Sequence, residues 1–138
     1  MPVNKPEQCI VSSCLIGLCT RYDGRSKPDC NCLEMLKNYQ YIPVCPEQLG
    51  GLSTPRVPAH LSGSGDEVLA GRAAVITREG TDVTRRFIAG AEAVLQIAQA
   101  QNIRLALLKA RSPSCGLTPQ LGVTAALLLA HGIRVIEF

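Results

Sequence analysis

The chain has 138 residues, a length typical of one compact domain, and 46% of them are apolar, which is enough for a buried core. The net charge of +3 comes without a basic run, and the two Phe, three Tyr and absent Trp offer little surface for stacking bases, so the composition argues against direct nucleic-acid binding. The longest apolar stretch, around Val123–Ala130, is far shorter than the ~18 residues that a membrane span requires, and no membrane association is expected.

The first half of the chain predicts two strands separated by a helix. In chain order we expect a strand over Cys9–Ser13, a turn-rich loop over Cys14–Lys27, a helix that Asp29 or Asn31 caps and that reaches Tyr39, and a strand over Tyr41–Cys45. Leu33, Met35 and Leu36 are expected to face inward from the helix. Pro43 predicts that the second strand pairs on one side only.

The second half predicts further strands and helices in alternation. In chain order we expect a Gly- and Pro-rich stretch to Gly65, a hairpin of Glu67–Ala70 with Ala73–Thr77, a helix over Asp82–Gln101, a strand over Ile103–Lys109, a loop over Ala110–Gln120, a helix over Gly122–His131 and a strand over Ile133–Phe138. The long helix is the clearest element, because Phe87, Ala91, Val94 and Ala98 recur on one face.

Alternating strands and helices predict an α/β fold, specifically a small three-layer Rossmann-like domain over residues 1–138 with a mainly parallel sheet and an added β-hairpin. In such sheets ligands bind beyond the carboxyl ends of the strands. Cys14 follows the first strand, Cys45 closes the second, and Cys115 lies in the loop after the third buried strand. The topology therefore predicts that these three cysteines meet at one edge of the sheet.

Cysteine is also the residue type whose frequency in this sequence is most unusual. The chain has seven cysteines, an odd number, and its polar beginning MPVNKPEQ is not typical of a signal peptide. A chain of this length needs no disulfide framework, so the cysteines predict a metal-binding or catalytic use in a cytoplasmic protein. Small residues surround Cys14, Cys45 and Cys115, so backbone N–H groups can approach a thiolate or a bridging sulfide there.

Three thiolates leave the type of metal site open. They suit an iron–sulfur cluster, or a zinc ion with His60 as the better fourth partner, since His131 is better explained as the end of a helix.

The other four cysteines have separate interpretations. Cys9 is expected in the core, and Cys19 is either a fourth ligand or a spare thiol. Cys30 and Cys32 form a lone C-x-C pair, for which packing is favoured over metal binding.

Further polar residues flank the three cysteines. Glu47 is the carboxylate best placed for proton transfer, although a Glu in the first turn of a helix would explain it as well. Ser112 and Ser114 are candidate catalytic hydroxyls, and turn formation is their ordinary alternative. The expected substrate-binding residues are Ser13, Asp23, Lys109 and Arg111, of which the last two bring positive charge to the same edge.

Five motifs together resemble the thiouracil desulfidase family, which was long catalogued as a domain of unknown function. They are SSCLIGLCTRYDGRSKP, IPVCPEQLGGLSTPR, GTDVTRRFIAGAE, LLKARSPSCG and GVTAALLLAHGI, and they follow the family's order over nearly the whole chain. Relatives usually have a longer loop between the last two motifs, whereas here only Leu117–Leu121 lies between Gly116 and Gly122.

The resemblance implies an enzyme that removes sulfur from small thiolated pyrimidines of the 2-thiouracil or 4-thiouridine type. It implies a [4Fe-4S] cluster held by Cys14, Cys45 and Cys115, whose fourth iron, free of a protein thiolate, would bind the substrate's sulfur and release it as sulfide without redox change. Glu47 would then activate the attacking water. Two alternatives stay open: a non-catalytic metal or redox-sensing module with a fully ligated cluster or zinc, and a metal-free transferase with a persulfide on Cys115.

Overall fold

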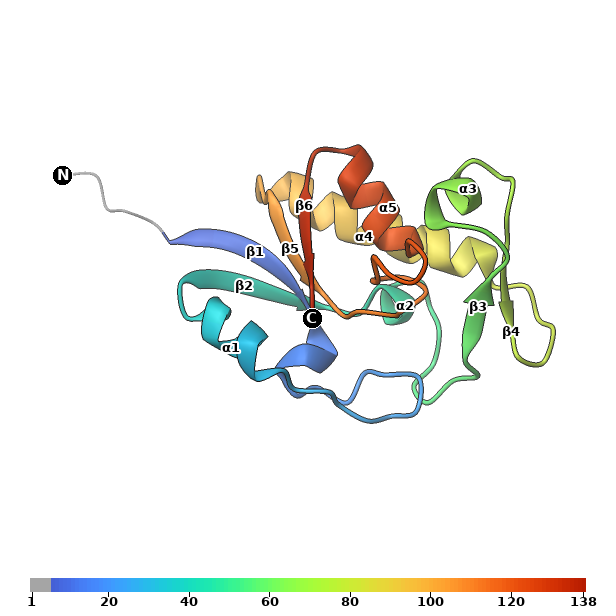
Figure 1. The fold of residues 1–138 in the computed structure, drawn as a ribbon, viewed down its shortest axis with the longest axis horizontal. Coiled ribbons are helices and arrows are strands. Elements are labelled where there is room, and N and C mark those ends of the chain that lie inside the picture. Colours follow the sequence, from blue (N-terminus) through green and yellow to red (C-terminus); the bar gives the residue numbers. More distant parts are fainter. Residues whose placement is uncertain (1–5) are drawn as a thin grey trace.

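The structure, a computed structural model, describes residues 6–138, in which strands and helices alternate along the chain (Figure 1). The strands are β1 (Glu7–Ser12), β2 (Tyr39–Val44), β3 (Ala59–Leu61), β4 (Val75–Thr77), β5 (Leu105–Leu108) and β6 (Arg134–Glu137). The helices are the short 3-10 helix η1 (Ser13–Ile16), α1 (Cys30–Leu36), α2 (Pro46–Leu49), α3 (Gly65–Leu69), α4 (Thr84–Ala100) and α5 (Val123–Ala130). None of the helices in this described range is long and apolar enough to cross a bilayer.

Four of the described strands form a parallel sheet in the order β2-β1-β5-β6. Strand β1 pairs with β2 from Glu7 opposite Tyr39 to Ser12 opposite Val44, and with β5 on its other side. Strand β2 lies at the edge of the sheet, which is where Pro43 is tolerated, as the sequence predicts. From β1 the chain continues to one side and from β5 to the other, so the two central strands form the switch point at which α/β sheets bind ligands.

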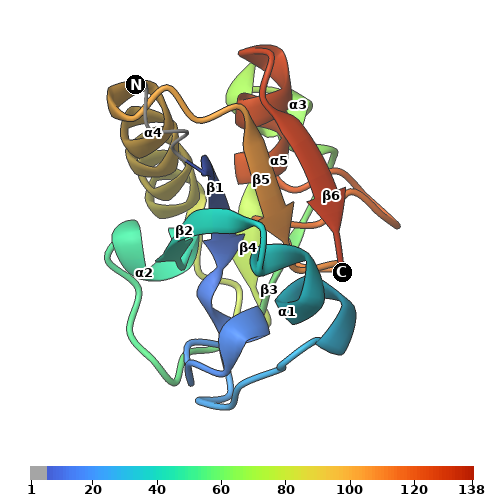
Figure 2. The ribbon, with the colours of Figure 1, turned by 90° about the vertical axis from the view of Figure 1, so that its left-hand side faces the viewer.

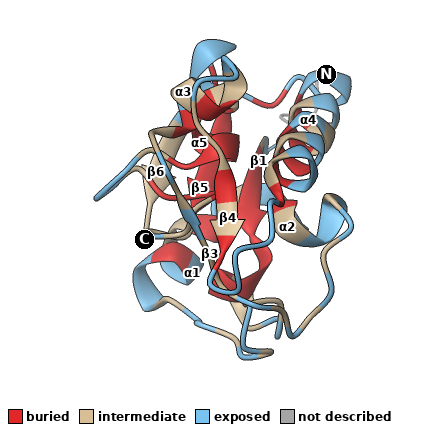
Figure 3. Cartoon of the chain, turned by 90° about the vertical axis from the view of Figure 1, so that its right-hand side faces the viewer, coloured by how far each residue is buried: buried red, intermediate tan, exposed pale blue. Residues whose placement is uncertain are grey.

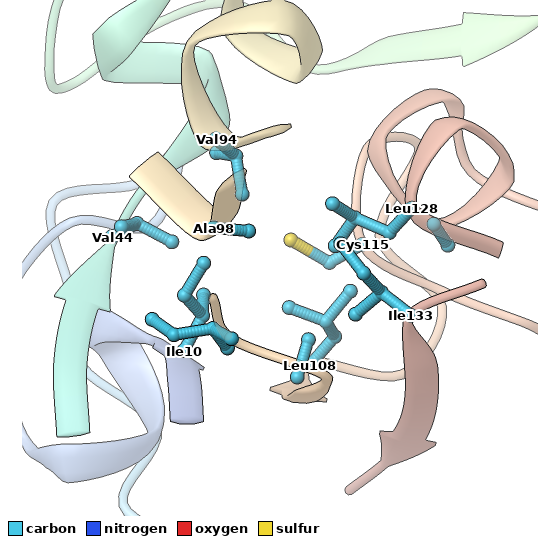
Figure 4. Close-up of a cluster of buried hydrophobic side chains, with 11 residues drawn as sticks. Ile10, Val44, Val94, Ala98, Leu108, Cys115, Leu128 and Ile133 are labelled. Carbon is cyan, nitrogen blue, oxygen red and sulfur yellow. The ribbon is translucent and has the colours of Figure 1, made fainter. Parts of the chain in front are cut away.

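Helices cover both faces of this sheet, which confirms the predicted three-layer α/β fold (Figure 2). On one face, side chains of α4 and α5 such as Val94 and Leu128 pack on Ile10 and Leu108 (Figure 4). On the other face, Cys32 and Leu36 of α1 pack with other side chains of the sheet and η1. Buried residues are accordingly concentrated in the central strands and on the inward sides of the helices (Figure 3).

The structure contains the predicted additional hairpin, but one of its two strands is a different segment from the one that the sequence predicts. Strand β4 is correctly expected within Ala73–Thr77, whereas its antiparallel partner is β3 and not Glu67–Ala70. The latter segment lies mostly in helix α3, because Val68 packs into a third apolar cluster with Phe87 of α4. The alternation of two or three apolar residues fits a short helix as well as a short strand, so packing decides between them.

Helix α1 is shorter than predicted. Asp29 caps it by accepting a hydrogen bond from the Cys32 N–H at 2.9 Å, but the helix ends at Leu36 and Tyr39 already begins β2. Leu33, expected to face inward, is 38% exposed, whereas Cys32 takes its place in the core. Met35 is only half-buried.

Helix α2 lies directly against α4 through two glycines. A Cβ atom at Gly50 would overlap the carbonyl oxygen of Arg86, and one at Gly90 would overlap that of Pro46. The two backbones can therefore approach so closely only because neither glycine has a side chain. This contact fixes α2, whose first turn carries Glu47 and whose N-cap is Cys45.

Substitution of Gly90 by Ala tests this contact. Alanine is the better helix former, yet we expect Gly90→Ala to lower the free energy of unfolding by about 1–3 kcal/mol, because the added methyl group pushes α2 away from α4. Chemical denaturation measures the effect. The matched control is Gln96→Ala on the exposed face of α4, which should change stability by less than about 0.5 kcal/mol. A neutral or stabilising Gly90→Ala would contradict the close packing.

Candidate active site

A cavity of about 430 Å³ opens beyond the carboxyl ends of β1, β2 and β5. The loops after these three strands line it, together with a segment between α2 and β3. Cys14, Cys45 and Cys115 each contribute to its wall, one from each loop. The sequence predicts this meeting of three cysteines at one edge, and the geometry brings them to the same cavity.

Cys14 lies in η1, immediately after β1. Its carbonyl oxygen accepts hydrogen bonds from the N–H groups of Gly17 at 3.2 Å and Lys27 at 2.9 Å, so the loop folds back around it. Gly17 has a φ of +102°, which favours glycine at this turn. Burial raises the pKa of the Cys14 thiol, the neighbouring Cys45 raises it further, and the positive charges of Lys109 and Arg21 act in the opposite direction.

Cys45 and Cys115 are held in different ways. Cys45 is the N-cap residue of α2, and its thiol lies 3.6 Å from the Thr20 carbonyl oxygen, to which it donates. Cys115 is 4% exposed and belongs to the apolar cluster between the sheet and α4, into which its sulfur points (Figure 4). Burial, with Glu47 and Cys45 as lesser causes, raises the pKa of the Cys115 thiol to about 12.

A chain of hydrogen bonds joins the predicted catalytic residues. The Ser114 hydroxyl donates to Glu47 Oε2 at 3.0 Å and lies 3.0 Å from the Ser112 hydroxyl. Ser112 Oγ accepts in turn from the N–H groups of Ser114 at 3.2 Å and Cys115 at 3.1 Å. Ser112 thus forms the turn that presents Cys115, while Ser114 connects that turn to Glu47.

Glu47 is paired with a residue that the sequence reasoning missed. Arg56 Nε lies 2.9 Å from Glu47 Oε1, and the two side chains are only 7% and 13% exposed, respectively. Arg56 Nη2 also donates to the Thr20 carbonyl oxygen at 3.0 Å and lies 3.8 Å from Cys45 Sγ. Its position in a Gly- and Pro-rich stretch without regular structure gives no periodicity from which burial could be predicted. The signal that could have identified it is its place at the end of the motif IPVCPEQLGGLSTPR, which also contains Cys45 and Glu47.

The predicted substrate-binding residues divide into two groups. Ser13, Lys109 and Arg111 line the cavity, and the Ser13 hydroxyl lies 2.6 Å from that of Thr20. Asp23 does not line it; its carboxylate accepts from the Arg25 N–H at 3.0 Å, in an exposed turn. Burial lowers the pKa of Lys109, and the nearby Arg21, Lys27 and Arg111 lower it further.

The remaining cysteines and both histidines lie away from the cavity. Cys9 and Cys32 are buried in the core, as expected for Cys9, while Cys19 and Cys30 are exposed. His60 is an exposed residue of β3. His131 ends α5, where its Nδ1 lies 3.0 Å from the Leu127 carbonyl oxygen. None of these side chains lines the cavity that the three other cysteines share.

The short segment between Gly116 and Gly122 forms a closed turn. The Gly122 N–H donates to the Gly116 carbonyl oxygen at 2.7 Å. The carboxylate of Glu137, at the end of β6, accepts from the N–H of Leu117 at 2.9 Å and from the hydroxyl of Thr118 at 2.7 Å. The chain thus passes from Cys115 into α5 with few residues, and Glu137 holds the beginning of this segment.

Comparisons with known proteins agree over nearly the whole chain. The profile of the 2-thiouracil desulfurase family matches residues 9–137. The uncharacterised protein YbbK of Bacillus subtilis (strain 168) is 40% identical over 142 aligned positions, which cover 93% of each chain. Among solved structures, the [4Fe-4S]-dependent thiouracil desulfidase TudS superposes with a TM-score of 0.80 at 42% identity, with 95% of this chain and 90% of that chain covered. The matched residues include every loop that lines the cavity.

Proposed function

The chain belongs to the 2-thiouracil desulfurase family, and we propose that it hydrolyses the carbon–sulfur bond of thiolated pyrimidines with the help of a [4Fe-4S] cluster. The observation that carries the proposal is the common cavity of Cys14, Cys45 and Cys115, with Glu47 and Ser114 on its wall. The products would be the oxo-pyrimidine and hydrogen sulfide, so that one water is consumed and no net redox change occurs.

The donor set fits the proposed cluster. Three thiols are soft ligands of the kind that hold iron–sulfur clusters, and all three come from loops in which small residues or proline stand close to the cysteine in sequence. The three cysteines line a cavity and do not converge on a single metal-ion position: within residues 6–138, no three Cys, His, Asp or Glu side chains are placed to hold one metal ion. A polynuclear group is therefore better supported than zinc. The cavity volume of about 430 Å³ is in the range of ligand sites.

The exposed position of Cys19 outside the cavity lining favours an open cluster site over a fully ligated one. Bound there, the cluster would supply a Lewis-acidic iron with affinity for a thiocarbonyl sulfur, which draws electron density from the ring carbon.

The protein's own residues would activate the water. Glu47 Oε2 faces the Ser114 hydroxyl at 3.0 Å, and both residues line the cavity. We infer that Glu47 takes the proton of the attacking water as general base. Ser114 would orient that water, because its hydroxyl oxygen, whose proton is donated to Glu47, can still accept a hydrogen bond from the water.

We further propose that residues 1–138 act as one desulfidase domain in the cytoplasm. Helices α4 and α5 contribute side chains both to the apolar cluster on the parallel sheet and to the apolar cluster beside the hairpin, which supports a single folding unit. All seven cysteines are free thiols, which suits a reducing compartment.

Iron and sulfide analysis of protein purified without oxygen tests the cluster. We expect about four irons per chain and a brown protein. The variants Cys14→Ala, Cys45→Ala and Cys115→Ala should each lose both iron and activity, because a removed thiolate leaves one iron without its ligand. The controls Cys9→Ala and Cys30→Ala should retain both, since these cysteines lie outside the cavity. Full iron content in Cys115→Ala would sink the three-ligand assignment.

The variant Glu47→Gln tests the general base. It keeps the shape of the side chain and most hydrogen bonds but removes the negative charge, so we expect an unchanged cluster spectrum and a turnover rate lowered by ~10²–10⁴-fold. A loss of iron would instead assign Glu47 to support of the Cys45 loop. Near-normal turnover with an intact cluster would rule out the base role and leave Ser112, Ser114 or another proton acceptor.

The positive charge at the cavity predicts a preference for anionic substrates. Lys109, Arg111 and Arg21 line the same opening. We therefore expect kcat/KM to be about tenfold or more higher for a thiouridine monophosphate than for thiouridine or thiouracil, because a hydrogen bond to a charged group contributes about 1.5–3 kcal/mol. Arg111→Gln should reduce this advantage, and the exposed Arg25→Gln should not. Equal kcat/KM for all three substrates would exclude a phosphate contact.

A further inference from the structure

We propose that Arg56 is a positioning residue of this site, which fixes the carboxylate of Glu47 and the sulfur of Cys45 with one guanidinium group. The proposal rests on the proposed function, because it assigns Arg56 a role toward the general base and toward a cluster ligand. Arg56 itself neither takes up the proton of the attacking water nor ligates the cluster. It acts through the two residues that it holds.

The contacts of Arg56 leave its side chain no freedom. Nε pairs with Glu47 Oε1 at 2.9 Å, and Nη1 donates to the Thr54 hydroxyl at 2.8 Å and to the Ser53 carbonyl oxygen at 3.3 Å. Nη2 donates to the Thr20 carbonyl oxygen at 3.0 Å. The backbone N–H of Arg56 also donates to the Tyr22 carbonyl oxygen at 2.7 Å. One side chain therefore ties the loop after β1 to the segment after α2.

The pairing with Arg56 determines how Glu47 presents its two oxygens. Oε1 is held by Arg56 Nε, whereas Oε2 accepts from Ser114. A carboxylate bonded at both oxygens by different neighbours cannot rotate about its last bond, so Oε2 and Ser114 keep a constant orientation at the cavity. Without the guanidinium, the buried carboxylate would lack its counter-charge and could turn toward other donors.

The same guanidinium places positive charge beside the Cys45 sulfur. Arg56 Nη2 lies 3.8 Å from Cys45 Sγ. Hydrogen bonds and charge next to a ligand sulfur are among the principal means by which a protein sets the properties of a cluster. An arginine at this position should therefore stabilise the more negative, reduced state of the cluster and raise its reduction potential.

Arg56 also forms part of the wall between two cavities. Glu47, Arg56 and Ala59 line both the active-site cavity and a second cavity of about 350 Å³ that reaches Phe87 of α4. The ion pair thus separates the site from this largely apolar space. A lysine could supply the charge but not the planar array of donors that meets several acceptors at once.

A double-mutant cycle on the cluster-loaded protein tests the role of Arg56 in positioning Glu47. The four proteins are the wild type, Glu47→Gln, Arg56→Gln and the double variant. We expect Arg56→Gln to lower kcat by ~10–100-fold with little change in KM, the usual cost of losing a supporting residue. In the Glu47→Gln background, the same change should lower kcat less than twofold, because Arg56 then has no general base left to orient.

The reduction potential of the cluster provides a readout that is independent of turnover. We expect a shift to more negative potential in Arg56→Gln, in both backgrounds, and a smaller shift in Arg56→Lys, which keeps the charge. The matched control is Arg86→Gln. Arg86 donates to the carbonyl oxygen of Gly51, a residue close to Arg56 in sequence, at 3.4 Å, but Arg86 does not line the active-site cavity. That variant should leave kcat and potential unchanged. If Arg56→Gln does not fold, Arg56→Lys replaces it throughout.

The outcomes separate this proposal from the proposed function. A wild-type protein without iron or desulfidase activity would contradict the function itself. With an active wild type, an Arg56 variant that has normal kcat and normal potential would overturn the positioning role. An equal fall in kcat in both Glu47 backgrounds would also overturn it, because Arg56 would then act independently of Glu47. A raised KM with unchanged kcat would assign Arg56 to substrate binding instead.

Discussion

Parallel pairing of β1 with both β2 and β5 is the constraint on which the site depends. Parallel strands end at the same edge of a sheet, so three loops from distant parts of the chain meet there without any contact between their own side chains being required. The register of β1 opposite β2 brings Ser12 level with Val44, and the next residues along each chain lead to Cys14 and Cys45. Backbone hydrogen bonding, and not the cysteines, therefore assembles the cavity.

The buried ion pair of the site, Glu47 with Arg56, is stable in this position because each of the two charges has the other as its partner. Burying a carboxylate or a guanidinium alone would cost several kcal/mol. Removing one member of a buried pair therefore lowers the stability of the fold more than replacing both members by apolar side chains. Glu47 and Arg56 are 13% and 7% exposed, and each also binds neutral groups, Ser114 in one case and Thr20 in the other. The network consequently joins the loops after all three strands.

The sequence allows the fold class and the three cavity cysteines to be predicted, because both follow from strand order and from where loops begin. It does not reveal the partner strand of β4, since a run as short as Glu67–Ala70 fits a helix or a strand equally well. Nor does it reveal Arg56, whose burial arises from contacts with Glu47 and Thr20 across three loops. Contacts between side chains of irregular segments leave no periodic pattern in the sequence, so they become visible only in the folded structure.

The three cavity cysteines also differ in what holds them, and this difference follows from the layers of the fold. Cys115 belongs to the apolar core between the sheet and α4, so its position is fixed by packing. Cys45 depends on α2, which the glycine contact seats on α4, and on the polar network of Arg56. One side of the cavity is thus as rigid as the core, whereas the other is held by hydrogen bonds. Glu47 lies on the second side beside Cys45, and its hydrogen bond with Ser114 connects it to the first side, next to Cys115.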